Sequence, residues 1–324
     1  MSYQLSVIII GKNTEKILAR SIDSVIAAVN KAGQLIEAFE VLYVDSNSTD
    51  SSLQIAEGYA EVRTVAITSS TFYSASLGRH LGLQHARYDN LLFLDGDMTL
   101  SPDWFTETEE AYARHRAIVG QWNERELSME GELNREIANY NGIEQEEVLI
   151  KPCGFLQINR KLIAGGQSFH PLIVNNEEKD FYAQFYGEGK IVGLPIKAFD
   201  HNNFKRKTSS KWAAFLSLNG KTGYLTSFYY AIKEGYVADY FRIQYDKFLN
   251  VLVLLCLIVA LLTWNVLWGV PALLLLVFPL GKLKSRLADL FFFPYKLYAT
   301  VRLLSQEHAA TYQVDGKTQE ADLK

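Results

Sequence analysis

The sequence is poor in cysteine and lacks a recognisable leader. Cys153 and Cys256 are the only cysteines in 324 residues, so no disulfide framework is available and a reducing, cytosolic setting fits. The opening run, MSYQLSVIII, has neither the basic flank nor the small-residue cleavage site of a signal peptide. We therefore expect it to form a buried first strand.

Two phosphate-binding motifs are also absent. The chain contains no G-x-G-x-x-G and no G-x-x-x-x-G-K-[ST], which excludes dinucleotide dehydrogenases and P-loop enzymes. Its 32 Lys and Arg residues nearly balance its 36 Asp and Glu residues, so no nucleic-acid partner is indicated. Basic residues do gather before the longest apolar run, where they suit phosphates or anionic lipid unless they form a solvated helix face: Lys205, Arg206, Lys207, Lys211 and Lys221.

Charge is missing altogether from residues 248–280, which read FLNVLVLLCLIVALLTWNVLWGVPALLLLVFPL. A polar break from Thr263 to Asn265 divides the run into two halves, each of which would form a helix roughly 23 to 26 Å long. We expect a membrane hairpin, with a buried pair of core helices as the alternative. Basic residues on both sides place both ends in the cytosol: Arg242, Lys247, Lys282, Lys284 and Arg286.

Between Leu5 and about Trp122, short apolar runs alternate with amphipathic stretches. Strands are predicted at LSVIII, FEVLYVD, VRTVAI and NLLFLDGD, and helices at Ile17 to Val29 and at Ala75 to Ala86. Strand, helix and strand in this order predict a doubly wound α/β fold with a mostly parallel sheet.

Polar residues follow three of these strands at the point where each strand ends. Ligands of open parallel sheets bind beyond the carboxyl ends of the strands, so this pattern predicts a nucleotide site. The residues concerned are Gly11, Lys12 and Asn13, then Asp45, Ser46 and Asn47, then Asp95 and Asp97.

Asp95 and Asp97 flank Gly96 at the end of an apolar strand. Two such carboxylates can hold Mg²⁺ or Mn²⁺, which would neutralise charge on the diphosphate of a nucleotide sugar. An ordinary Asp-Gly turn is the structural alternative for this motif.

The segments LSVIIIGKN, EVLYVDSNSTDSS, LGRHLGLQHARYDNLLFLDGDM, PCGFLQINRKLIAGGQSF and NNEEKDFYAQFYGEGKI resemble, in order and spacing, the family 2 inverting glycosyltransferases of the GT-A fold. The resemblance covers roughly Leu5 to His201. It implies that Asp45 reads the base and ribose, that Asp95, Gly96 and Asp97 bind metal and diphosphate, that Glu178 is the general base, and that His201 is a further metal or diphosphate contact.

The sequence departs from the commonest family pattern at two positions. Ser46 stands where a second Asp often follows Asp45, and Glu178 stands where Asp is commoner. Glu178 can perform the same proton transfer with its acceptor about one methylene further away, and Glu177 is its nearest rival.

Several residues of the same region have a structural explanation beside the functional one. Lys12 and Arg79 are nucleotide or diphosphate candidates that could instead face solvent or pack on a helix. His201 could be an ordinary hydrogen-bonded histidine. Trp122, Glu124 and Arg125 are candidates for the border of the acceptor pocket.

These patterns predict a catalytic domain over residues 1–204, basic linker helices over 205–247, a membrane hairpin over 248–281, interfacial amphipathic helices over 282–305 and a loose polar tail over 306–324. The predicted protein is an inverting glycosyltransferase at the cytosolic face of the inner membrane. It would move a sugar from a nucleotide sugar to a lipid-linked acceptor, and the family resemblance implies that the donor is a UDP-sugar. The alternatives are a nucleotidyltransferase, which should carry a Gly-rich basic phosphate loop after its first strand, and a non-catalytic membrane scaffold, which would be expected to lose the acidic motifs.

Overall fold

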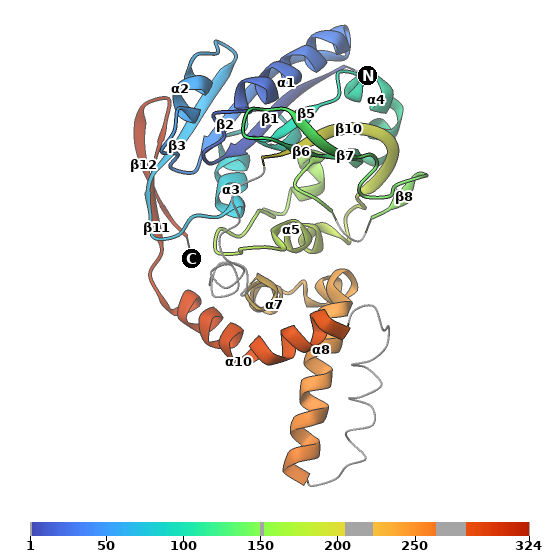
Figure 1. The fold of residues 1–324 in the computed structure, drawn as a ribbon, viewed down its shortest axis with the longest axis vertical. Coiled ribbons are helices and arrows are strands. Elements are labelled where there is room, and N and C mark those ends of the chain that lie inside the picture. The colour runs from blue at the N-terminus through green and yellow to red at the C-terminus, as the bar shows by residue number, and fades with distance from the viewer. Residues whose placement is uncertain (1, 150–151, 205–222, 264–282, 324) are drawn as a thin grey trace.

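The computed structural model describes residues 2–149, 152–204, 223–263 and 283–323, which form an α/β fold (Figure 1). Its strands are β1 (Tyr3–Gly11), β2 (Ile36–Asp45), β3 (Val62–Ser70), β4 (Asn90–Asp95), β5 (Met98–Leu100), β6 (Ala117–Leu127), β7 (Leu133–Ile137), β8 (Glu147–Val148), β9 (Leu156–Asn159), β10 (Val192–Phe204), β11 (Ala309–Val314) and β12 (Lys317–Asp322). Its helices are α1 (Leu18–Ala32), α2 (Ser52–Glu57), α3 (Ala75–His85), α4 (Trp104–His115), α5 (Glu177–Phe185), α7 (Gly223–Glu234), α8 (Val237–Thr263) and α10 (Leu283–Ser305), with 3-10 turns at Gly33–Leu35 and Arg160–Ile163.

One mixed sheet runs through the molecule in the order β12-β11-β3-β2-β1-β4-β9-β6-β10-β5, with β7 paired to β6 and β8 to β10. The four neighbouring strands from β3 to β4 are parallel, and β6 is parallel to β10. β9 lies between β4 and β6 and is antiparallel to both. The predicted α/β class and its parallel central strands are therefore confirmed.

The register of the parallel strands aligns the predicted polar strand ends. Gly11 at the end of β1 pairs with Asp45 at the end of β2, and Ile10 pairs with Asp95 at the end of β4. Side chains that follow these strands consequently lie together at the carboxyl ends of the central strands. This end of the sheet carries the candidate site.

Local sequence signals explain how the flanking helices are placed. Ile22, Val25 and Val29 recur on one face of α1 and are buried against the sheet. Ser74 caps α3, because its Oγ accepts a hydrogen bond from the Leu77 amide at 2.9 Å. Both helices start close to the carboxyl ends of the strands, where the candidate site lies.

A further layer of helices lies beyond α5, where α7, α8 and α10 pack on one another and α7 and α8 contact α5 (Figure 1). α8 is kinked at Gln244, whose φ is −117° and ψ is 26°, and its distal part extends away from the body of the protein in Figure 1. Within the described residues, no helix is both long enough and apolar enough to cross a membrane.

The predicted membrane-proximal segments are described only in part. Residues 248–263 of the expected hairpin belong to α8, whereas its remainder, from residue 264, lies outside the described residues. The basic cluster from Lys205 to Lys221 also lies outside them. Where a pair of interfacial helices was expected, the structure has a single helix, α10, with Pro294 inside it.

The expectation of a loose polar tail is wrong. β11 and β12 form a hairpin, and β11 extends the sheet by pairing antiparallel with β3. Ala310, Tyr312 and Val314 alternate along β11 and are buried, so the segment has one apolar face despite its polar composition. The hairpin thus extends the sheet beyond β3.

Candidate active site

A cavity of about 720 Å³ opens at the carboxyl ends of the central strands. Its walls come from the strand ends, from residues 70–74 and from the start of α3. The lining residues are Ile10, Gly11, Lys12, Thr14, Ser46, Ser70, Thr71, Phe72, Tyr73, Ser74, Ala75, Asp95, Gly96 and Asp97. The structure therefore brings six predicted site residues into one cavity, namely Gly11, Lys12, Ser46, Asp95, Gly96 and Asp97.

Asp45 and Asn13 support this cavity from behind. Asp45 is 2 % exposed, and its carboxylate accepts hydrogen bonds from the amide and hydroxyl of Ser48 at 2.8 and 2.5 Å. Asn13, at a positive φ of 56°, accepts a bond from the Thr49 amide at 2.8 Å. These contacts join the loops after β1 and β2, while the predicted nucleoside contacts of both residues remain predictions.

Arg79 lies at the centre of an acidic cluster beside the cavity. Its buried guanidinium donates to Asp95 Oδ1 at 2.8 Å and to Glu177 Oε1 at 3.0 Å, and Glu178 Oε1 lies 3.4 Å from its Nη1. One cation thus faces three carboxylates, and the predicted metal motif is connected through it to the predicted base. The sequence alone did not decide whether Arg79 contacts diphosphate or packs on a helix. The structure places it at the centre of this cluster.

The two adjacent glutamates differ in how firmly Arg79 holds them. Glu177 makes the shorter contact and its side chain is 10 % exposed, whereas that of Glu178 is 23 % exposed. Burial, followed by the charge of Glu177, raises the pKa of Glu178 to about 7 although Arg79 opposes the shift. Glu178 is thus the more accessible carboxylate and has a pKa suited to a general base near neutral pH.

Asp97 and His201 meet across the β5–β10 pairing. His201 pairs with Met98, which places its Nε2 3.5 Å from Asp97 Oδ2, and its Nδ1 lies 2.9 Å from Glu124 Oε2. Burial lowers the pKa of His201, but hydrogen bonds and charges from Asp97 and Glu124 outweigh this and raise it to about 9. Glu124, considered from sequence for the acceptor side, is thus a partner of His201.

The donor set suits a hard divalent cation. Among the described residues, no group of three or more His, Cys, Asp and Glu side chains is arranged to hold a metal ion. Mg²⁺, however, is commonly held by one or two carboxylates together with substrate phosphates. Asp97 Oδ1 is buried and has no hydrogen-bond partner in the described part of the chain. Asp95 and Asp97 therefore fit an ion that arrives with a diphosphate.

The segment that follows Pro152, which belongs to the motif PCGFLQINRKLIAGGQSF, lies against the acidic cluster. A Cβ atom on Gly154 would lie 2.5 Å from Arg79 Nη2 and 2.8 Å from Asp95 Oδ2, so only glycine allows this approach. Burial raises the pKa of the neighbouring Cys153 thiol to about 12, which keeps it protonated. Cys153 therefore has a packing role beside the acidic cluster and lacks the reactivity of a thiolate.

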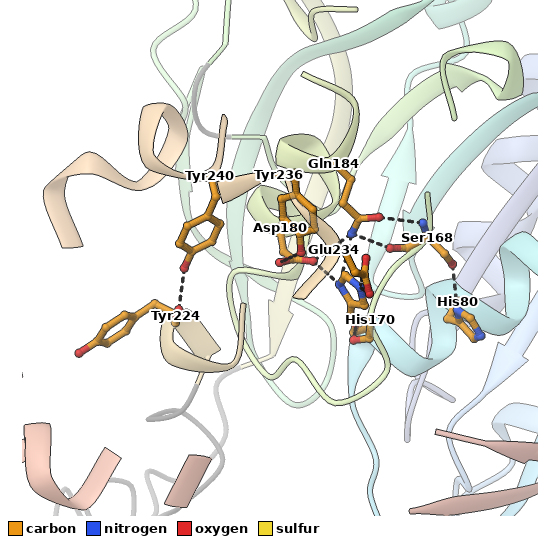
Figure 2. A network of polar contacts seen from close by, with 10 residues as sticks. His80, Ser168, His170, Asp180, Gln184, Tyr224, Glu234, Tyr236 and Tyr240 are labelled. Atoms are coloured by element: carbon orange, nitrogen blue, oxygen red, sulfur yellow. Dashed lines mark hydrogen bonds and ion pairs between the residues drawn. The ribbon is translucent and has the colours of Figure 1, made fainter. Parts of the chain in front are cut away.

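A polar network joins α5, which carries both glutamates, to the C-terminal helices (Figure 2). His170 Nδ1 lies 2.6 Å from the fully buried Asp180 of α5, and its Nε2 lies 3.0 Å from Glu234 at the end of α7. The Tyr236 hydroxyl, just before α8, donates to Asp180 at 2.9 Å. Burial lowers the pKa of His170, but Asp180 and Glu234 raise it above its ordinary value. This network was not expected from sequence.

The C-terminal segment also supports the cavity wall formed by residues 70–74. His308 Nε2 lies 2.7 Å from the Leu303 carbonyl, to which it donates, and Nδ1 lies 3.2 Å from Thr71 Oγ1. The Thr71 amide donates to the Ala309 carbonyl at 3.3 Å, and the Phe72 ring packs edge-on against His308. The end of α10 is therefore connected to the wall of the cavity.

Residues 6–162 match the Glycosyl transferase family 2 model, so the chain carries a family 2 glycosyltransferase domain. The resemblance inferred from the sequence motifs is confirmed at this level. None of the curated proteins matches the chain.

Two solved structures of S. aureus TarS share the fold over nearly the whole chain. TarS 1–349 in complex with UDP-GlcNAc has 16% sequence identity and a TM-score of 0.53, with 98% of this chain and 97% of that chain covered. TarS 1–349 has 16% identity and a TM-score of 0.50, with 98% and 96% covered. At this identity the likeness concerns the fold alone.

Proposed function

We propose that the protein is an inverting, metal-dependent glycosyltransferase that moves a sugar from a UDP-sugar to a lipid-linked acceptor at the cytosolic face of the inner membrane. The observation that carries the proposal is the Arg79 cluster, in which one buried guanidinium contacts Asp95 beside the cavity and both Glu177 and Glu178 on α5. Donor-side and acceptor-side carboxylates are thereby held in one arrangement.

In the proposed reaction Glu178 accepts the proton of an acceptor hydroxyl, and the hydroxyl oxygen bonds to the anomeric carbon of the donor sugar. The bond between that carbon and the diphosphate breaks, and the nucleoside diphosphate leaves with the electron pair. A single in-line displacement inverts the anomeric centre. Arg79 keeps Glu177 paired and orients α5, so that the accessible Glu178 meets the acceptor.

Asp95 and Asp97 would hold Mg²⁺ or Mn²⁺, with His201 beside Asp97. Such an ion supplies neutralisation of the charge that develops on the departing diphosphate. Within the chain itself, Lys12 lines the cavity, with its Nζ 4.5 Å from the centre of the Tyr73 ring. This ammonium is available to phosphate oxygens.

UDP-sugar is the proposed donor because the family resemblance favours it and because a structure of the same fold contains UDP-GlcNAc. The lipid-linked acceptor is supported by the apolar run at residues 248–280. It is also supported by exposed apolar side chains on the packed helices α7 and α10, which suit an interfacial surface: Tyr229, Ile232, Leu297, Tyr298 and Val301.

A screen of nucleotide sugars for hydrolysis by the full-length protein, with Mn²⁺ or Mg²⁺, tests the proposal. We expect UDP release from at least one UDP-sugar and loss of release when EDTA is added. Consumption of a nucleoside triphosphate and a sugar phosphate with release of pyrophosphate would instead indicate a nucleotidyltransferase. Absence of turnover and of nucleotide binding would favour a non-catalytic scaffold.

A further inference from the structure

The helix that carries the proposed base, α5, has an irregular start. Two successive asparagines before it have positive φ, 68° at Asn175 and 67° at Asn176. The Asn176 side chain makes no capping hydrogen bond among the described residues, and the first turn holds the carboxylates of Glu177, Glu178 and Asp180. The position of Glu178 therefore depends on the contacts that side chains of α5 make with the rest of the protein.

Asp180 connects α5 to the C-terminal helices. It follows Glu178 by two residues, which is roughly 200° around a helix, so the two carboxylates lie on nearly opposite faces of α5. Asp180 is completely buried. Its carboxylate accepts a hydrogen bond from the Tyr236 hydroxyl at 2.9 Å and lies 2.6 Å from His170 Nδ1 (Figure 2). A movement of Asp180 would turn or tilt this short helix, and Glu178 would move with it.

His170 is held in place by α3 and α7. Its ring stacks on Tyr230 of α7, with centroids 4.1 Å apart and planes inclined by 9°, and its Nε2 lies 3.0 and 3.1 Å from the two carboxylate oxygens of Glu234. Its backbone carbonyl accepts a hydrogen bond from Ser76 Oγ of α3 at 2.6 Å. Because α3 begins at the wall of the cavity at the strand ends, His170 links that wall to both α5 and α7.

The contacts of the His170 ring require a proton on both nitrogens. Nδ1 faces Asp180 and Nε2 faces Glu234, whereas a neutral imidazole can donate from only one nitrogen. The other titratable groups near the ring carry no negative charge at neutral pH: Tyr230 and Tyr236, whose pKa values are raised chiefly by burial, His80, whose pKa burial lowers to about 4, and Lys233. The imidazolium thus joins two carboxylates that belong to different helices.

We propose that His170 is a positioning residue: its imidazolium ties Asp180 of α5 to Glu234 of α7 and thereby sets the orientation in which Glu178 meets the acceptor. His170 does not line the cavity at the strand ends, so it acts through α5 and not on the donor. A side chain that donates on one side only would leave one of the two carboxylates without its partner. The assignment rests on the proposed function, in which Glu178 is the base.

The test measures kcat for UDP release from UDP-GlcNAc, or from whichever UDP-sugar the hydrolysis screen identifies, by the full-length protein with water as the acceptor. We expect His170→Ala to lower kcat roughly 10- to 100-fold, because a small misplacement of a reacting group has an effect of this size. UDP affinity measured by calorimetry should stay unchanged. His170→Gln, which can still donate to one carboxylate, should recover part of the loss. His115→Ala is the matched control, because His115 also pairs with a carboxylate, that of Glu146 at 2.8 Å, but lies on α4.

Two further measurements separate positioning from a general loss of stability. The acidic limb of the kcat–pH profile, assigned to Glu178, should move to lower pH in His170→Ala. Burial chiefly raises the pKa of Glu178 to about 7, and a displaced α5 would reduce that burial. Glu234→Ala should lower kcat in the parent protein and have no further effect in His170→Ala, because both changes break the same link.

The outcomes distinguish the positioning role from the proposed function. Unchanged kcat in His170→Ala, or an equal loss in His115→Ala, would overturn the positioning role. A lowered kcat with an unmoved acidic limb and an additive effect of Glu234→Ala would also overturn it. If His170→Ala does not fold, His170→Gln and Glu234→Ala provide the same comparison.

A parent protein that turns over no UDP-sugar would contradict the transferase reaction and leave the link itself open to hydrogen exchange. Faster exchange of the α5 amides in His170→Ala than in His115→Ala would then support the link between His170 and α5. Equal exchange in the two variants would overturn it.

Discussion

The Arg79 guanidinium holds three carboxylates of the candidate site close together, and its Nε atom is buried without a partner among the described residues. A cation with one planar fork can satisfy Asp95 and Glu177 at the same time, which a lysine ammonium cannot reproduce in that geometry. Glu178 contacts the same fork at a longer distance. The three carboxylates are consequently unequal, and this inequality decides their proposed roles.

Replacing Glu178 with Gln keeps the shape of the side chain and removes its basicity. We expect sugar transfer to fall roughly 10²- to 10⁴-fold, while nucleotide affinity measured by calorimetry stays normal, because Glu178 does not line the donor cavity. Glu177→Gln is the matched comparison. Normal transfer by Glu178→Gln together with loss in Glu177→Gln would move the base by one residue, and normal transfer by both would exclude this mechanism.

The reaction should also depend on pH through the same group. Burial and the charge of Glu177 raise the pKa of Glu178 to about 7, and a base acts only when it is ionised. We therefore expect kcat to fall about tenfold per pH unit as the pH drops below about 7, and to level off above it. A pH–rate profile of the parent protein measures this limb. The limb should be missing from the residual activity of Glu178→Gln.

Asp97→Asn should weaken metal-dependent nucleotide binding severely, because it removes a charge from the proposed ion site. Calorimetry with UDP and Mn²⁺ measures the effect. Asp89→Asn is the control, since the Asp89 side chain is 63% exposed and lies on the surface. Equal affinity for the parent and Asp97→Asn would show that the ion binds elsewhere or is not needed.

Strand ends allowed much of the candidate site to be predicted from sequence. Gly11, Asp45 and Asp95 follow apolar runs, and parallel pairing must bring such ends together. The pairing of Arg79 with Glu177 joins residues 98 positions apart. No local pattern encodes a contact at that separation, so the cluster of carboxylates around Arg79 could not be predicted.

At the scale of elements, the C-terminal hairpin shows a signal that composition concealed. Asp315 and Gly316 both have positive φ, 49° and 75°, and an Asp-Gly pair between alternating segments is a strong hairpin signal. Buried positions alternate along β11 before this turn. The hairpin could therefore have been predicted from sequence, but its pairing with β3 could not, because an edge partner is chosen by tertiary contacts.

The junction between α10 and β11 should affect donor binding. His308→Ala removes the hydrogen bonds to Leu303 and Thr71 that support the wall of the donor cavity. We expect UDP affinity measured by calorimetry to fall roughly 5- to 10-fold, the change that corresponds to loss of about 1 kcal/mol of support. Glu320→Ala, at an exposed position of β12, is the control. Unchanged affinity in His308→Ala would mean that the wall holds its shape without the junction.

At the scale of the whole molecule, the catalytic sheet and the C-terminal helices are connected on two sides. The His170 network joins α5 to α7 and to Tyr236, just before α8 (Figure 2). His308 joins the end of α10 to the wall of the cavity at the strand ends. The site therefore borders a helical layer from which the apolar run at residues 248–280 continues. Membrane attachment, as proposed, would anchor the protein through the same layer that supports the site.

We expect the full-length protein to stay with the membrane fraction after carbonate or high-salt washing, because burial of so much apolar surface outweighs the cost of ordering it. Fractionation followed by immunoblotting measures this. Recovery of the full-length chain in the soluble fraction without detergent would contradict the attachment. Digestion of the β11–β12 hairpin, or of the sheet that it extends, by protease from the periplasmic side would contradict the cytosolic orientation.

The pairing of β11 with β3 also has a consequence for the order of events during synthesis. Residues 309–314 of β11 lie beside residues 65–70 of β3. During synthesis, β3 therefore has no partner on this side until the ribosome has made the whole apolar run and β11. During that interval β3 presents unpaired backbone groups to other chains. Translation that stops before residue 309 would leave this edge open permanently, and the shortened product should aggregate even though every proposed catalytic residue is present.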